Sequence, residues 1–156
     1  MYHGYHRGMA DTPPELRAST PGPLEEALAS VGDRWTLLVV AALLDGPRRF
    51  GDLQRALPGI APNVLSGRLR HLEEQGLIVA QPYSKRPPRY IYELTSAGAD
   101  LAGALRLLAG WGARHRDADP PRHEACGTQL EARWYCPTCE RPVDDEQAAA
   151  DEVHYA

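Results

Sequence analysis

The clearest pattern in the chain is a pair of short apolar repeats between residues 46 and 76, each with the three- and four-residue spacing of an amphipathic helix. The apolar positions of the first are Phe50, Leu53 and Leu57, and those of the second are Leu65, Leu69 and Leu72. Pro58 and Gly59 separate the two repeats, and Pro62 suits the first turn of the second helix because its missing N–H needs no partner there. The pattern predicts a short helix, a tight turn and a second helix.

The second of these helices has a small polar face opposite its leucines. At about 3.6 residues per turn this face carries Asn63, Ser66, Gly67 and Arg70, with Arg68 and His71 on its flanks. Such a face is typical of a helix-turn-helix, whose second helix enters the major groove of DNA. A solvated surface face would have the same spacing, so the pattern alone leaves both interpretations open.

Two further helices are predicted before this unit. Residues 24–31 form a short amphipathic helix that ends at Gly32, and Asp33 is a good N-cap for a helix over 34–44. The broad apolar face of this second helix consists of Trp35, Leu38, Val39, Ala42 and Leu43. We therefore expect the helix over 34–44 to be the central core helix.

Two β-prone stretches follow, over 77–81 and 89–94. The segment between them, PYSKRPP (82–88), contains too many prolines for a central strand, so we expect a β-hairpin wing with a stiff tip. Lys85, Arg86 and Arg89 lie near this tip, from which they can reach flanking phosphates or a minor groove.

The next pattern predicts one long helix from Thr95 or Ser96 to about His115. Its apolar residues form two neighbouring stripes, which are wider than packing on one small domain requires. We interpret the excess as a homodimer interface, shared with the first helix. The residues assigned to it are Leu24, Leu28, Leu101, Leu105, Leu108 and Trp111. A wholly intramolecular core is the alternative.

The formal net charge of −4 is at first sight unfavourable for a DNA-binding protein. The charge is unevenly distributed, because residues 46–92 hold eight basic and three acidic side chains, a net +5 that leaves −9 for the rest. Distant surface charges are screened at cellular salt, so the positive segment governs contacts with phosphates. The candidate DNA contacts are Arg48, Arg49, Asn63, Ser66, Arg68, Arg70, Lys85, Arg86 and Arg89.

The 156 residues allow one domain with a small appendage. Composition predicts five segments: a flexible N-terminal tail (1–22), a winged-helix DNA-binding and dimerisation domain (23–116), a linker (117–122), a zinc-binding unit (123–143) and an acidic tail (144–156). The sequence contains neither a membrane-spanning run nor a secretory leader, so we expect a soluble, cytoplasmic protein.

The three cysteines lie near the C-terminus with the spacing of metal ligands. His123-x2-Cys126 and Cys136-x2-Cys139 form two pairs, and the x2 spacing lets both residues of a tight turn reach one ion. We predict one structural zinc ion per chain, bound by all four residues, whose binding stabilises a unit too small to bury a core. A neighbouring carboxylate or a water molecule is the alternative to His123 as the fourth ligand. Residues 128–135 alternate enough to form a short hairpin between the pairs. A reducible Cys136–Cys139 pair and inert thiols are the alternatives.

The order of elements resembles the HxlR family of bacterial winged-helix transcription regulators. The resemblance rests on PLEEAL (23–28), on the stretch from VGDRW to GLI (31–78) and on PPRYIYELTSAG (87–98), and covers about residues 23–112. It implies a dimer that binds an inverted-repeat operator with the 61–75 helix and the wing, and several such proteins are thiol-based or small-molecule sensors. Many members have a cysteine just before the position of Pro23; here Gly22 replaces it, which excludes a sensor built on that thiol.

The sequence therefore predicts a mainly α fold with a small β-hairpin wing, a dimeric winged helix-turn-helix with a C-terminal zinc-knuckle unit. The leading function is a sequence-specific DNA-binding transcriptional regulator, with a small-molecule effector or a redox signal left open as its input. The alternative is a winged-helix and zinc-ribbon module that docks on the transcription machinery, although such a module would more naturally carry an apolar patch on its second helix. An enzyme is least favoured, because a zinc ion with four protein ligands has no open position.

Overall fold

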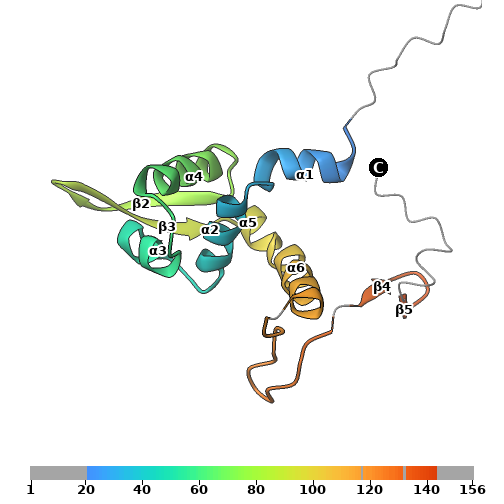
Figure 1. The fold of residues 1–156 in the computed structure, drawn as a ribbon. Helices are drawn as coiled ribbons and strands as arrows, with labels where there is room; N and C mark the ends of the chain where they lie inside the picture. The colour runs from blue at the N-terminus through green and yellow to red at the C-terminus, as the bar shows by residue number, and fades with distance from the viewer. Residues whose placement is uncertain (1–20, 117, 132, 144–156) are drawn as a thin grey trace, which may run out of the picture.

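The computed structural model describes residues 21–116, 118–131 and 133–143, so most of the tail predicted over 1–22 and all of the acidic tail over 144–156 lie outside the described residues. The elements are α1 (Pro23–Val31), α2 (Arg34–Leu44), β1 (Arg48–Arg49), α3 (Phe50–Ala56), α4 (Pro62–Glu74), β2 (Ile78–Lys85), β3 (Pro88–Leu94), α5 (Ser96–Asp100), α6 (Ala102–His115), β4 (Trp134–Cys136) and β5 (Arg141–Val143). Figure 1 shows helices gathered around a small sheet whose long hairpin projects from the body. The winged helix-turn-helix fold is confirmed.

Helix α2 begins and ends where its sequence predicts. The Asp33 carboxylate accepts hydrogen bonds from the backbone N–H groups of Trp35 (3.0 Å) and Thr36 (3.1 Å), as an N-cap residue does. Val39 and Val40 are fully buried, so α2 is the central core helix.

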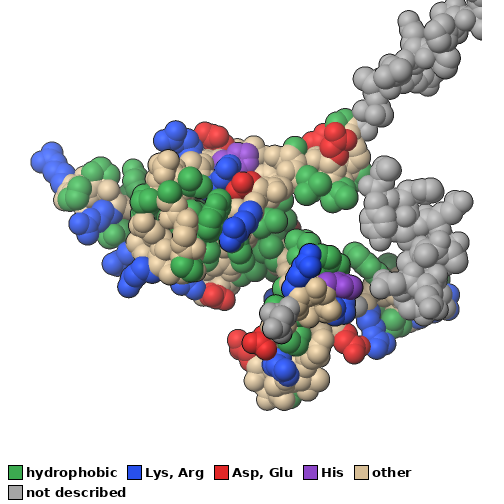
Figure 2. Space-filling model, viewed as in Figure 1, with side chains coloured by type: hydrophobic (Ala, Val, Ile, Leu, Met, Phe, Trp, Pro, Cys, Tyr) green, Lys and Arg blue, Asp and Glu red, His purple; other side chains and the backbone are tan. Residues whose placement is uncertain are grey.

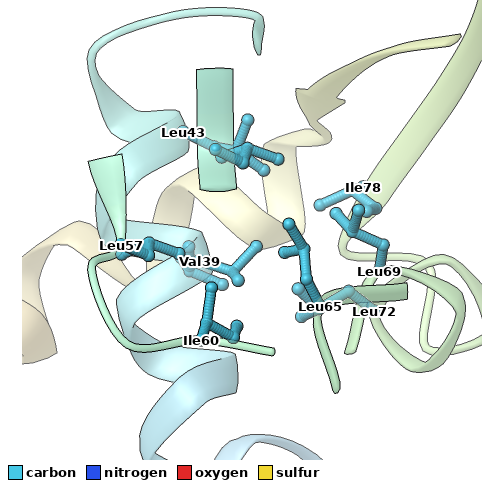
Figure 3. Close-up of a cluster of buried hydrophobic side chains, with 10 residues drawn as sticks. Val39, Leu43, Leu57, Ile60, Leu65, Leu69, Leu72 and Ile78 are labelled. Carbon is cyan, nitrogen blue, oxygen red and sulfur yellow. The ribbon is translucent and has the colours of Figure 1, made fainter. Parts of the chain in front are cut away.

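A single apolar cluster holds α2, α3, α4 and β2 together (Figure 3). Its buried members are Val39, Val40, Leu43, Leu53, Leu57, Ile60, Leu65, Leu69, Leu72 and Ile78. Ile60 lies in the turn between α3 and α4, and its burial fixes the angle at which α4 leaves that turn. The core therefore sets the orientation of α4 directly.

The three-stranded sheet has the order β1-β3-β2, and its short strand β1 was not predicted. The wing strands are also longer than expected, because β2 continues to Lys85 and β3 begins at Pro88, so the prediction of a loop over 82–88 was wrong. Pro82 is tolerated because β2 is an edge strand and the ladder is irregular between Pro82 and Ser84.

The prediction of one unbroken helix from residue 95 to residue 115 was also wrong. Thr95 does act as the N-cap, since its hydroxyl accepts from the Gly98 N–H at 3.2 Å, but α5 ends at Asp100. The Leu101 N–H bonds to the Gly98 carbonyl three residues back (3.3 Å), which tightens the chain before α6 begins. Gly98 is required, because a Cβ there would lie 2.1 Å from the Leu77 carbonyl oxygen.

In the C-terminal part, strands β4 and β5 pair antiparallel and an isolated bridge joins Arg122 to Gln129. The prediction of a hairpin over 128–135 was wrong. The antiparallel pairings enclose each of the two x2 turns, not the segment between the turns. A positive φ follows the second residue of each pair, at Gly127 (69°) and Glu140 (52°), and reverses the chain there. None of the described residues between 118 and 143 is buried.

No single helix in the described ranges is long and apolar enough to cross a membrane; α1 and α2 would be so only as a pair, with an 82° bend between them.

Candidate nucleic-acid interface

Helix α4 has one buried and one exposed face. Its three core leucines are buried as predicted (Figure 3), while Asn63, Ser66, Gly67 and Arg70 are exposed on the opposite side. Arg70 forms no ion pair with any other residue that the structure describes. The residues predicted to read bases therefore share one accessible surface.

Arg68, another predicted DNA contact, is engaged within the protein. Its Nε lies 2.9 Å from the Asp33 carboxylate, and the two side chains are 37% and 39% exposed. Because the same carboxylate caps α2, this pair ties the middle of α4 to the start of the core helix. His71 adds a second tie, since its Nε2 lies 2.8 Å from the Ser30 carbonyl at the end of α1.

Arg48 is also held internally. Its Nε donates to the Ala42 carbonyl at 2.6 Å and its terminal nitrogen lies 3.0 Å from the Asp45 carboxylate. A cation at this place satisfies a carbonyl of the last turn of α2 and interacts favourably with the helix dipole. Arg48 thus stabilises the helix end, a role that the sequence prediction did not assign to it.

Arg49 lies beside the wing because β1 pairs with β3, with Arg49 opposite Ile91. Its guanidinium is 4.6 Å from the centre of the Tyr83 ring, a cation–π contact. A shallow hollow here is lined by Arg49, Phe50, Gly51, Tyr83, Pro88, Arg89, Tyr90 and Tyr92. Sequence reasoning missed Tyr83 and Tyr90, and the available signal was the presence of two aromatic residues within a basic segment. In the structure both rings are half-exposed.

The wing carries exposed cations near its tip. Lys85, Arg86 and Arg89 are exposed near the turn between β2 and β3, as predicted, and Figure 2 shows Lys and Arg side chains gathered at the projecting end of this hairpin. Burial raises the pKa of Tyr92 at the base of the wing. Lys85, Arg86 and Arg89 form no ion pair with any other residue that the structure describes.

The residues predicted to form a dimer interface divide into two groups. Leu24, Leu28, Leu108 and Trp111 are 56%, 56%, 53% and 50% exposed in the single chain. Leu101 and Leu105 are instead partly buried against the core of their own chain. The exposed apolar surface of α6 therefore includes fewer of the predicted residues than expected, and it lies toward the C-terminal half of the helix.

The predicted zinc ligands are arranged as two pairs. His123 Nδ1 lies 3.3 Å from Cys126 Sγ, which in turn is 3.2 Å from the Thr128 hydroxyl. Cys136 and Cys139 lie on the second x2 turn. Within the described ranges no three His, Cys, Asp or Glu side chains are close enough to share an ion, so a four-ligand site stays a prediction.

Comparison with known proteins agrees with this geometry. A family model described as HxlR-like helix-turn-helix matches residues 30–120. The uncharacterised HTH-type transcriptional regulator Rv3095 of Mycobacterium tuberculosis is 46% identical over 118 residues, which are 72% of this chain and 74% of that protein. The HTH-type transcriptional regulator YodB of Bacillus subtilis is 32% identical over 88 residues, 56% of this chain and 79% of YodB.

Solved structures show the same fold. The structure of PA1607, described as a transcription factor, has a TM-score of 0.68 and 30% identity, and the match covers 84% of this chain and 93% of that one. The redox regulator HypR in its oxidised form has a TM-score of 0.57 and 31% identity, covering 62% and 99% of the two chains. The match of the family model over more than half of the sequence shows that this chain belongs to the HxlR-like helix-turn-helix family of DNA-binding transcriptional regulators.

Proposed function

We propose that this regulator binds an inverted-repeat operator as a homodimer, with α4 in the major groove and the wing on the flanking backbone. The observation that supports it most is the exposed face of α4, where Asn63, Ser66 and Arg70 are accessible on a helix whose other face is locked in the core. A helix held in this way can present side chains to base edges without losing its orientation.

The arginines of the region have different roles in this proposal. Arg70 reads a base edge, and Lys85, Arg86 and Arg89 contact phosphates or a minor groove. Arg49, stacked on Tyr83, lies at the base of the wing. It contacts the DNA backbone between the part bound by α4 and the part bound by the tip of the wing. Arg48 and Arg68 act mainly inside the protein, where their ion pairs hold α2 and α4 in place.

A homodimer follows from the geometry of two-fold operators. Two recognition helices must lie about 34 Å apart, one turn of DNA, to read two half-sites on the same side. Leu24 and Leu28 on α1 and Leu108 and Trp111 on α6 are large apolar side chains left half-exposed. Burial of these residues between two copies would remove them from water and fix the spacing of the two α4 helices.

A docking module for the transcription machinery is less well supported. Such a module would need an apolar surface on α4, whereas its exposed residues are small or polar. The solved relative HypR is described as a redox regulator. Because every cysteine of the present chain falls between residues 126 and 139, a thiol-based response would act through the C-terminal unit.

A salt titration of operator binding tests the proposal, with the operator first recovered by selection from genomic DNA. Arg70→Ala should weaken specific binding by about 1–3 kcal/mol and relax the preference for one base pair. Arg86→Ala should weaken specific and non-specific binding alike and reduce the salt slope by about one.

Arg133→Ala provides the control, because Arg133 is exposed in the C-terminal unit and pairs only with Glu131 among the described residues. It should bind DNA as the parent does. If Arg70→Ala and Arg86→Ala also match the parent at every salt concentration, the assigned surface is wrong.

A further inference from the structure

The two x2 turns of the C-terminal unit have the same backbone geometry. In each turn a first donor residue is followed three positions later by a second, and the next residue has a positive φ. Antiparallel pairing then closes both turns at the following residue. The corresponding positions are His123 and Cys136, Cys126 and Cys139, Gly127 and Glu140, and Thr128 and Arg141.

The repeated positive φ is informative because this backbone conformation is unfavourable at one of the two positions. Glycine adopts a positive φ freely, as at Gly127, but a side chain with a Cβ does so rarely. Glu140 is the one non-glycine residue with a positive φ among the described residues. Its presence directly after Cys139 indicates that the turn, not the residue, decides the backbone conformation there.

Polar groups within each turn surround a cysteine sulfur. The backbone N–H groups of Cys139 and Thr138 hydrogen-bond to the Cys136 sulfur. In the first turn, the hydroxyl of Thr128 and the ring of His123 lie within 3.3 Å of Cys126 Sγ. Thiolate sulfur and imidazole nitrogen are preferred ligands of zinc.

Burial does not hold this unit together. Leu130, Trp134 and Tyr135 are 45%, 54% and 60% exposed, and none of the described residues from 118 to 143 is buried. Each turn is formed by residues adjacent in sequence, but no buried apolar side chain among the described residues joins the two turns. The segment between them includes Ala132, which lies outside the described residues.

We propose that one zinc ion per chain joins the two turns, bound by His123, Cys126, Cys136 and Cys139, and so forms a small zinc ribbon. Four protein ligands complete a tetrahedral shell, which makes the ion structural. On binding, each of the three cysteines forms a Zn–S bond and releases its proton to solvent. The inference is independent of the proposed DNA-binding mode.

Elemental analysis of the full chain, purified under reducing conditions without chelator or added metal, tests the proposal. We expect about one zinc atom per chain, and loss to background in a Cys136→Ser/Cys139→Ser double variant. Titration with Co²⁺ should give the visible absorption of tetrahedral thiolate coordination in the parent and not in the double variant. His123→Ala should weaken Zn²⁺ binding, measured by competition with a chelator, by at least about tenfold.

Two matched variants separate ligand loss from damage to the turn. Thr138→Ser changes a residue between the two cysteines that is not a ligand, and Glu140→Gly keeps the positive φ at lower strain, so both should retain zinc. Absence of zinc from the reduced parent, or unchanged zinc in the double variant, would overturn the proposal. Parent affinity in His123→Ala would remove His123 from the ligand set.

Operator binding distinguishes this proposal from the proposed function. The double variant should bind DNA as the parent does, because its cysteines lie outside the winged-helix domain. Zinc binding together with a failure of the parent to bind DNA would overturn the operator proposal and support the zinc site.

Discussion

The winged-helix domain and the C-terminal unit of this chain are held by different interactions. The first encloses ten buried apolar side chains shared by α2, α3, α4, β2 and the turns between them. The second has two tight turns with short strand pairings and no buried side chain among its described residues. Burial of one large apolar side chain contributes about 1.5–3 kcal/mol, whereas an exposed turn hydrogen bond contributes about 1 kcal/mol or less.

This difference explains why the exposed face of α4 has a fixed orientation, whereas the two turns of the C-terminal unit would be joined only by the proposed zinc ion. Helix α4 shares its leucines with the common core, so its exposed face is fixed by the whole domain. The two x2 turns are each fixed only by their own residues. We expect substitutions of similar chemistry to have large effects in the first region and small ones in the second.

The largest expected difference concerns removal of one leucine. Leu65 is fully buried, so Leu65→Ala should lower the free energy of unfolding of the winged-helix domain by about 2–5 kcal/mol, measured by urea denaturation. Leu130→Ala, at a position 45% exposed in the C-terminal unit, should change the same transition by less than about 0.5 kcal/mol. Equal effects would mean that both parts unfold as one unit.

A second comparison concerns two apolar residues whose side chains have similar exposed fractions in the single chain. Leu108 on α6 and Leu130 are 53% and 45% exposed, but only Leu108 belongs to the proposed dimer interface. Leu108→Glu should place a charge in that interface and weaken dimerisation by about 10–100-fold, a loss of about 1.4–2.8 kcal/mol in sedimentation measurements. Leu130→Glu should leave the dimer intact. A Leu108→Glu chain that remains fully dimeric would contradict this assignment.

The smallest expected effect concerns two ion pairs. Asp33 pairs with Arg68 and also caps α2, so Asp33→Ala should cost about 0.5–2 kcal/mol of stability. Glu131 and Arg133, both at least 70% exposed, form an isolated surface pair, and Glu131→Ala should cost less than about 0.5 kcal/mol. Thermal denaturation monitored by circular dichroism compares the two variants. A cost at Glu131 as large as that at Asp33 would show that the C-terminal unit contributes to the main transition.

Features decided by neighbours in the sequence were predictable. The start of α2 follows from the capping carboxylate of Asp33, and the buried face of α4 follows from its leucine spacing. The start of the helical segment at Thr95 was set by its hydroxyl in the same way. Each of these interactions joins residues within four positions of one another, so composition and spacing were sufficient.

Tertiary structure decided which groups the arginine side chains contact. The pattern could not show that Arg70 is exposed, whereas Arg68 pairs with Asp33 at the N-cap of α2. Nor could it show that Arg48 donates to a carbonyl at the end of α2. Pairing of β1 with β3 brought Arg49 to Tyr83, although a two-residue strand has no recognisable period. The sequence by itself determined α2 and α4 and their buried faces, because these depend on local spacing. The partners of each arginine depend on contacts between distant segments, which only the folded chain brings together.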